Sequence, residues 1–101
     1  MKLKNIYKKG TKFTNKEKLQ EACKEWIEND IKAFIKYGYI IYWDVSEITD
    51  MSCLFNNCKL NATFNISGWD ASNVTDMRCM FMNCELNHTF DISKWDVSNV
   101  T

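Results

Sequence analysis

The sequence predicts an α+β protein, with an N-terminal helical cap followed by a solenoid of short parallel strands and short helical turns. The first observation is a repeat: Trp43, Trp69 and Trp95 are spaced by 26 residues, and each is followed by Asp, one small apolar residue and Ser. A fixed period of this length is typical of proteins whose units bury their apolar faces by stacking. The second observation is helical spacing of apolar residues ahead of the repeat. We therefore divide the chain into a cap at 1–42 and a solenoid at 43–101, with units at 43–68, 69–94 and, in part, 95–101.

The two complete units are closely related, with identical residues at 16 of their 26 positions. Three of the differing positions keep an apolar side chain, which predicts that they face the core: Val45/Ala71, Ile48/Val74 and Leu54/Met80. The other seven change charge, polarity or size, as positions on the outside of a protein permit. Because one unit has too few apolar residues to close a core alone, we expect neighbouring units to share one.

Three patterns predict the local structure inside a unit. Residues 63–67 and 89–93 alternate polar and apolar side chains with period two, which is typical of a half-buried strand with Phe and Ile turned inward. Residues 51–55 and 77–81 place apolar side chains at i, i+3 and i+4, which predicts one or two helical turns. The segment Asp-x-Ser-Asn-x-Thr-Asp at 70–76 is rich in side chains that bond their own backbone, which predicts a turn.

The residues before the repeat predict two helices. Thr14-Asn15-Lys16-Glu17 has the pattern of a capping box and precedes apolar residues at helical spacing, so we expect a helix from near Asn15. Asn29-Asp30 predicts the start of a second short helix, and Gly38 predicts its end. Residues 39–43 are then expected to form an irregular first strand. We expect the apolar face of the helices to cover the first repeat unit, as terminal caps do in repeat proteins.

Composition argues against several classes of function. Thirteen basic residues balance thirteen acidic ones, which gives no reason to expect nucleic acid as a partner. The longest apolar run, at 39–43, is far shorter than the roughly 20 residues of a membrane span, so no membrane span is expected. Residues 1–9 are basic but have no apolar core, so we expect no secretory signal in them and leave the compartment open.

The repeat motif Trp-Asp-Val-Ser-Asn-Val-Thr-Asp-Met-x-x-Met-Phe-x-Asn-Cys resembles the BspA-type leucine-rich-repeat-like surface repeats. Similar arrays occur in lipoprotein-like proteins of wall-less bacteria and in giant viruses. The resemblance covers nearly everything after residue 13 and implies a leucine-rich-repeat-like solenoid. It also implies adhesion or protein contacts at a cell or viral surface, and it brings no catalytic residues. The missing export signal departs from the family pattern.

Stacked units would align chemically reactive side chains in columns. The cysteine columns, Cys53 with Cys79 and Cys58 with Cys84, suggest zinc, a disulfide within a column, or plain packing of small buried residues. Columns of carboxylates suggest calcium, or turn residues that cap nearby backbone N–H groups: Asp44, Asp70 and Asp96, and Asp50 and Asp76. His88 has Ala62 as its counterpart and no nucleophile at catalytic spacing, so we expect no enzyme and no cofactor.

The sequence therefore predicts a non-enzymatic scaffold with a protein partner, and a metal-binding structural protein is the alternative. The outward polar side chains of the two expected strands are the candidate contact residues: Thr63, Asn65, Ser67, Thr89, Asp91 and Ser93. The last unit leaves an apolar edge uncovered at Phe90, Ile92, Trp95 and Val100. We expect this edge to act as a template for another coil, including end-to-end self-association of two copies.

Overall fold

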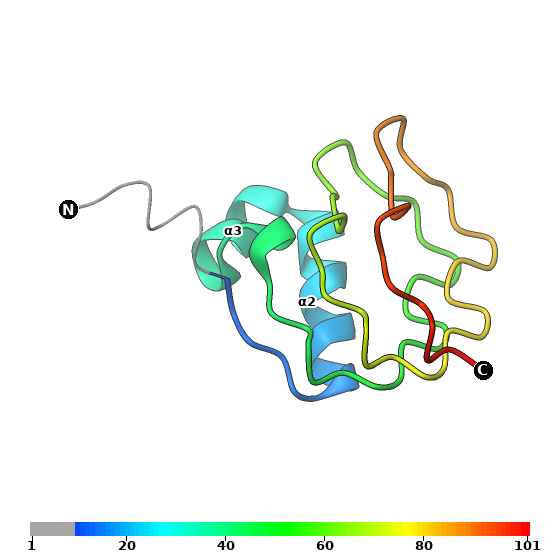
Figure 1. Ribbon diagram of the computed structural model, residues 1–101. Coiled ribbons are helices and arrows are strands. Elements are labelled where there is room, and N and C mark those ends of the chain that lie inside the picture. The colour runs from blue at the N-terminus through cyan, green and yellow to red at the C-terminus, as the bar shows by residue number, and fades with distance from the viewer. Residues whose placement is uncertain (1–9) are drawn as a thin grey trace.

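The computed structural model describes residues 10–101 and shows helices at one end of the molecule and irregular stacked coils at the other (Figure 1). Helix α2 spans Lys16–Glu28, helix α3 spans Asp30–Tyr37, and the short 3-10 helix η1 spans Ile40–Tyr42. The expectation about a secretory signal concerns residues 1–9, which lie outside the described residues. We call residues 43–68 coil 1 and residues 69–94 coil 2.

The predicted parallel strands and α+β class are wrong, because residues 10–101 contain no strand and only three isolated parallel bridges. The expected strands at 63–67 and 89–93 fold as consecutive turns instead. The reason is local: the Asn65 side chain accepts the Ser67 N–H (3.0 Å), and the Asp91 carboxylate accepts the Ser93 N–H (2.8 Å). A side chain that takes a backbone donor in this way competes with pairing between strands.

The predicted helical turns at 51–55 and 77–81 are also replaced by a different turn structure. Cys53 and Asn57 in coil 1, and Cys79 and Asn83 in coil 2, have positive φ values of 56 to 62°. Left-handed residues cannot continue a right-handed helix. Each segment is therefore a series of overlapping turns, in which Leu54 donates to the Met51 carbonyl (3.3 Å). The expected strand at 39–43 is wrong as well, because Ile40–Tyr42 forms η1.

A column of indoles fixes the spacing between the coils. Trp69 stacks on Trp43 at 6.3 Å between ring centroids and on Trp95 at 6.5 Å. The indole N–H of Trp69 donates to the Ile40 carbonyl (2.8 Å), and that of Trp95 donates to the Ile66 carbonyl (3.0 Å). A buried indole thus keeps its polar atom paired while its ring fills the core. The repeat needs tryptophan at this position because it uses both properties.

The predicted helix boundaries are largely confirmed. Asn15, not Thr14, caps α2, since its side chain accepts the Lys18 N–H at 3.1 Å. Asn29 caps α3 through the Lys32 N–H at 3.1 Å, and Gly38 ends α3 with a φ of 83°. An oxygen-bearing N-cap and a positive-φ glycine are the expected signals for a start and a stop.

Helix α2 lies against coil 1, as expected of a cap, with Leu19, Ala22, Cys23 and Trp26 buried (Figure 1). Helix η1 approaches the other end of coil 1 so closely that a Cβ atom on Gly68 would lie 2.7 Å from the Ile41 carbonyl oxygen. The equivalent residue in coil 2 is Lys94, which is exposed. Gly68 is exposed, as its variability predicted, and the close approach of the cap is a second reason for glycine at this position.

We expect Trp69→Ala to lower the free energy of unfolding by about 3 to 5 kcal/mol, because it removes a buried indole with neighbours on both ring faces. Trp95→Ala is the matched control and should cost clearly less, since within residues 10–101 Trp95 has a ring partner on one face only. Chemical denaturation of both variants measures the difference. Equal losses would contradict the indole column as the central contact of the core.

Candidate binding surfaces

The six predicted contact residues do not form one strand face. Four of them, Asn65, Ser67, Thr89 and Asp91, line a shallow hollow of about 310 Å³ together with Lys94. Ser93, which lies between Asp91 and Lys94 in the sequence, is exposed but does not line the hollow. The side chains of Asn65 and Asp91 are already engaged in their own turns. This hollow offers a mixed polar surface, and much of its hydrogen-bonding capacity holds the turns.

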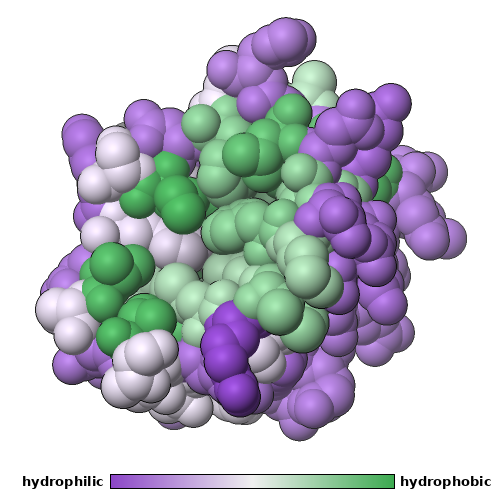
Figure 2. Space-filling view, turned by 90° about the vertical axis from the view of Figure 1, so that its right-hand side faces the viewer, coloured by the Kyte–Doolittle hydropathy of each residue, from purple (hydrophilic) through white to green (hydrophobic). Residues whose placement is uncertain are grey.

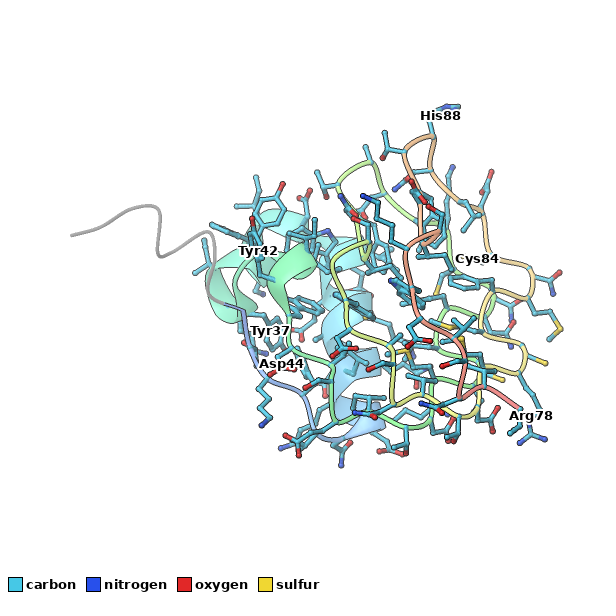
Figure 3. The ribbon with its side chains drawn as sticks, viewed as in Figure 1. Tyr37, Tyr42, Asp44, Arg78, Cys84 and His88 are labelled. Atoms are coloured by element: carbon cyan, nitrogen blue, oxygen red, sulfur yellow. The ribbon has the colours of Figure 1, made fainter. Side chains whose placement is uncertain are left out.

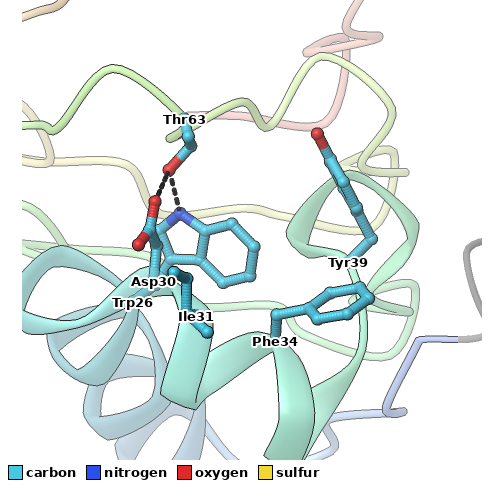
Figure 4. A pocket seen from close by; sticks show the side chains of 6 residues that line it. All are labelled: Trp26, Asp30, Ile31, Phe34, Tyr39 and Thr63. Atoms are coloured by element: carbon cyan, nitrogen blue, oxygen red, sulfur yellow. Dashed lines mark hydrogen bonds between the residues drawn. The ribbon is translucent and has the colours of Figure 1, made fainter.

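Thr63, the sixth predicted residue, lies at the junction between the cap and coil 1. Its hydroxyl accepts a hydrogen bond from the Trp26 indole N–H (3.1 Å) and donates one to the Asp30 carboxylate (2.7 Å), as Figure 4 shows. Asn61 adds a second link, since its amide donates to the Trp26 carbonyl at 2.9 Å. Thr63 thus joins α2, α3 and coil 1.

Beside this junction the cap forms a pocket of about 210 Å³ that sequence reasoning missed (Figure 4). Its walls are mainly aromatic, with the Tyr39 ring centroid 6.0 Å from that of Trp26 and 5.9 Å from that of Phe34. Ile31, which is 70% exposed, forms part of the rim. Such a pocket suits an apolar or cationic side chain. Trp26 and Phe34 belong to the helical apolar pattern and Tyr39 belongs to the expected irregular strand, so no sequence pattern joins these three residues.

The aspartate columns are built from turn residues. The Asp44 carboxylate accepts the Ser46 hydroxyl (2.6 Å) and backbone N–H (3.0 Å), and these bonds lower its pKa. The same bonds from Ser72 lower the pKa of Asp70, while the neighbouring carboxylates of the column act in the opposite direction. Each carboxylate therefore has a structural task in its own turn.

The second acidic column is balanced by basic side chains. Arg78 holds Asp76 by two side-chain hydrogen bonds (2.9 and 3.1 Å) and lowers the pKa of Asp76 to about 2. Lys16 of α2 lies 3.4 Å from Asp50 and 2.8 Å from the Ser52 hydroxyl. Within residues 10–101, no three His, Cys, Asp or Glu side chains gather closely enough to hold a metal ion.

The cysteines are free thiols in the described structure. Cys53 and Cys79 are exposed, while partial burial raises the pKa of Cys58 and of Cys84 and so favours the protonated thiol. His88 projects from the outer tip of its loop, at the end of the coil opposite Arg78 (Figure 3). It lies apart from Cys84, the labelled thiol of the same coil. No geometry for nucleophilic catalysis arises from these residues.

An apolar surface covers the face of coil 2 and residues 95–101 that is turned away from coil 1, which we call the C-terminal edge. Figure 2 shows apolar side chains across the middle of this face with polar ones around them. Exposed and half-buried members are Phe81, Met82, Leu86, Phe90, Ile92 and Val97. The coil 1 equivalents of four of them, Phe55, Leu60, Phe64 and Ile66, are buried, so these repeat positions change from core to surface.

The repeat region also identifies the family. A family described as "Mycoplasma protein of unknown function, DUF285" matches residues 28–101. The chain belongs to this family. Comparisons with curated proteins and with solved structures found no match. The matched range begins at the end of α2 and includes α3, so the second cap helix belongs to the family pattern together with the repeats.

Among residues 10–101, every helix is too short or too polar to cross a lipid bilayer.

We expect Thr63→Val to lower the free energy of unfolding by about 1 to 2 kcal/mol, because it leaves the buried Trp26 indole N–H without its acceptor. Thr89→Val is the matched control at the equivalent position of coil 2, where the hydroxyl bonds, among the described residues, only Asn87 of its own turn. That change should stay within about 0.5 kcal/mol. Thermal and chemical denaturation measure both variants. Equal losses of stability in Thr63→Val and Thr89→Val would contradict a junction role for Thr63.

We also expect the fold to lose stability in acid. The aspartates of both columns have pKa values below the ordinary 3.8, so their contribution is complete above that value and is lost as pH falls toward 2. The thermal midpoint should be flat from neutral pH to about 5 and should fall steeply below about 4. Asp70→Asn keeps an acceptor for the turn but removes one titrating group, and it should make the acid loss smaller. An unchanged acid slope would contradict the assignment for Asp70.

Proposed function

We propose that this protein is a non-enzymatic scaffold that binds another polypeptide, and that the C-terminal edge is its principal contact surface. The observation that carries the proposal is a difference between equivalent residues. Leu60 in coil 1 is 5% exposed, whereas Leu86 in coil 2 is 51% exposed. The C-terminal edge carries apolar side chains at repeat positions that are buried in coil 1, and no other segment within residues 10–101 covers them. Contiguous apolar surface of this kind is typical of protein contact sites.

The remaining observations agree with a contact role. The repeat motif resembles surface proteins that make adhesive or protein contacts, which supports a polypeptide ligand and a cell-surface or viral setting. The balanced net charge supports neither nucleic acid nor anionic lipid as the ligand. The aspartate and cysteine columns have structural explanations in the turns and in the packing, so no specific observation favours the metal-binding alternative.

The test compares two single substitutions of exposed apolar residues. Leu86→Asp places a charge in the C-terminal edge, and Ile35→Asp places one on α3, where Ile35 is 79% exposed. Both should change the free energy of unfolding by less than about 1 kcal/mol, because neither site is buried. Immobilised wild-type protein and both variants are then incubated with proteins of the cells that produce the chain, and captured polypeptides are identified by mass spectrometry.

We expect a polypeptide that the wild type and Ile35→Asp retain and that Leu86→Asp loses by about tenfold or more, because a charge buried against an apolar partner is not compensated. A partner lost equally with both variants would place the contact on the cap. Absence of any partner that depends on Leu86 would contradict the proposal.

A further inference from the structure

Most of the backbone hydrogen bonds between the coils along 51–60 run from coil 1 to coil 2. In coil 1, the N–H groups of five residues donate to carbonyls of coil 2 at N···O distances of 2.9 to 3.0 Å: Met51 to Asp76, Cys53 to Arg78, Phe55 to Met80, Asn57 to Met82 and Leu60 to Glu85. The intervening N–H groups of Leu54, Asn56 and Cys58 bond inside their own turns. At these five positions coil 1 therefore presents donors toward coil 2. The Thr75 and Glu85 N–H groups donate in the opposite direction, to the Thr49 and Cys58 carbonyls (both 2.8 Å).

The same positions of coil 2 have no coil to donate to. The N–H groups of Met77, Cys79, Phe81, Asn83 and Leu86 make no hydrogen bond within residues 10–101. In contrast, Met80, Met82 and Cys84 bond inside their own turns, as their equivalents do. The C-terminal edge thus presents five free donors along 77–86. Backbone N–H groups aligned in one direction form a surface that favours acceptors.

Acceptors on the same edge fix the register of an incoming chain. The Cys58 carbonyl receives the Glu85 N–H (2.8 Å), and the equivalent Cys84 carbonyl receives no donor within the described residues. The Asn61 and Phe64 carbonyls receive the Asn87 amide (2.8 and 2.9 Å), and Ile66 receives the Trp95 indole. The equivalent carbonyls of Asn87, Phe90 and Ile92 could accept the same hydrogen bonds from the Asn side chain and the Trp indole of a further unit with this motif.

This arrangement limits which partners can bind through the backbone. Two copies that meet edge to edge would bring together the donors of 77–86, which cannot bond each other, and only the few carbonyls of the edge, such as that of Cys84, could accept them. Two copies stacked head to tail would need the carbonyl side of coil 1, but α2 covers that side, with Gln20 bonded to the Cys53 carbonyl at 3.5 Å. End-to-end self-association, as expected from the sequence, would therefore rely mainly on side chains.

We propose that the C-terminal edge binds a polypeptide segment that carries the same 26-residue motif and whose carbonyl side is uncovered. The proposal rests on the scaffold function given above, and it continues the interface between coils 1 and 2 by one period. The incoming coil supplies carbonyls at the positions equivalent to 76, 78, 80, 82 and 85. It also supplies the stacking indole and the Asn side chain that the edge is shaped to receive.

The test adds a synthetic peptide with the sequence of residues 76–101 to isotope-labelled protein and follows amide hydrogen exchange by NMR. A free peptide must order itself on binding, so a large excess, on the order of millimolar, is used. We expect exchange of the Met77, Cys79, Phe81, Asn83 and Leu86 amides to slow by about tenfold or more. The Met80, Met82 and Cys84 amides, which are already bonded, should change little.

Two further peptides and one variant complete the design. A peptide of residues 50–75 carries the motif of the first unit and should protect the same five amides, whereas a scrambled peptide of 76–101 should protect none. Leu86→Asp should weaken the protection by about tenfold. Equal effects of the scrambled peptide, or protection that grows with protein concentration without peptide, would overturn the proposal.

The outcome also separates this proposal from the function on which it rests. If the motif peptides leave the five amides unchanged while Leu86→Asp still abolishes capture of a cellular partner, the motif partner is wrong and the scaffold function stands. If the motif peptides protect none of the five amides and no captured partner depends on Leu86, both the motif partner and the scaffold function are wrong.

Discussion

Each coil depends on an indole N–H bonded to a carbonyl 29 residues earlier in the chain, at Trp69 and again at Trp95. This bond fixes the spacing between successive coils, because the indole rings then stack with 6.3 to 6.5 Å between their centroids. Trp43 begins the column with its indole bonded to the Gly38 carbonyl (3.0 Å) at the end of α3. The cap therefore sets the position of the first indole, and the coils follow from it.

The turn chemistry explains how a stack of coils is held without strands. Asp and Asn side chains bind the N–H two residues ahead, so those donors are not available to a neighbouring coil. Connections between coils then fall to a few backbone bonds in 51–60 and to side-chain amides such as Asn73, which donates to the Ser46 carbonyl (2.7 Å). Asparagine recurs in the motif because it serves both as a turn residue and as a link.

The sequence is informative where one signal dominates and misleading where two compete. Asn29 and Gly38 predict their helix boundaries correctly because capping is local. Phe64 and Ile66 are buried as the alternation predicts, yet the same alternation also predicts a strand, and the side chain of Asn65 overrides it. The aromatic pocket could not be predicted, because Trp26 and Tyr39 meet only after η1 folds back on α2. The free donors of the C-terminal edge involve backbone atoms, on which side-chain patterns carry no information.

The direction of the backbone bonds gives the molecule two unlike ends. At the cap, the carbonyl side of coil 1 meets α2, whose Lys16 and Gln20 supply donors from side chains. At the C-terminal edge, donors face outward and no helix covers them within the described residues. Apolar burial alone would allow either end to receive a partner, since apolar contact has no direction. Hydrogen bonds do have direction: five N–H groups of coil 1 along 51–60 donate to coil 2, while the Thr75 and Glu85 N–H groups donate back to coil 1.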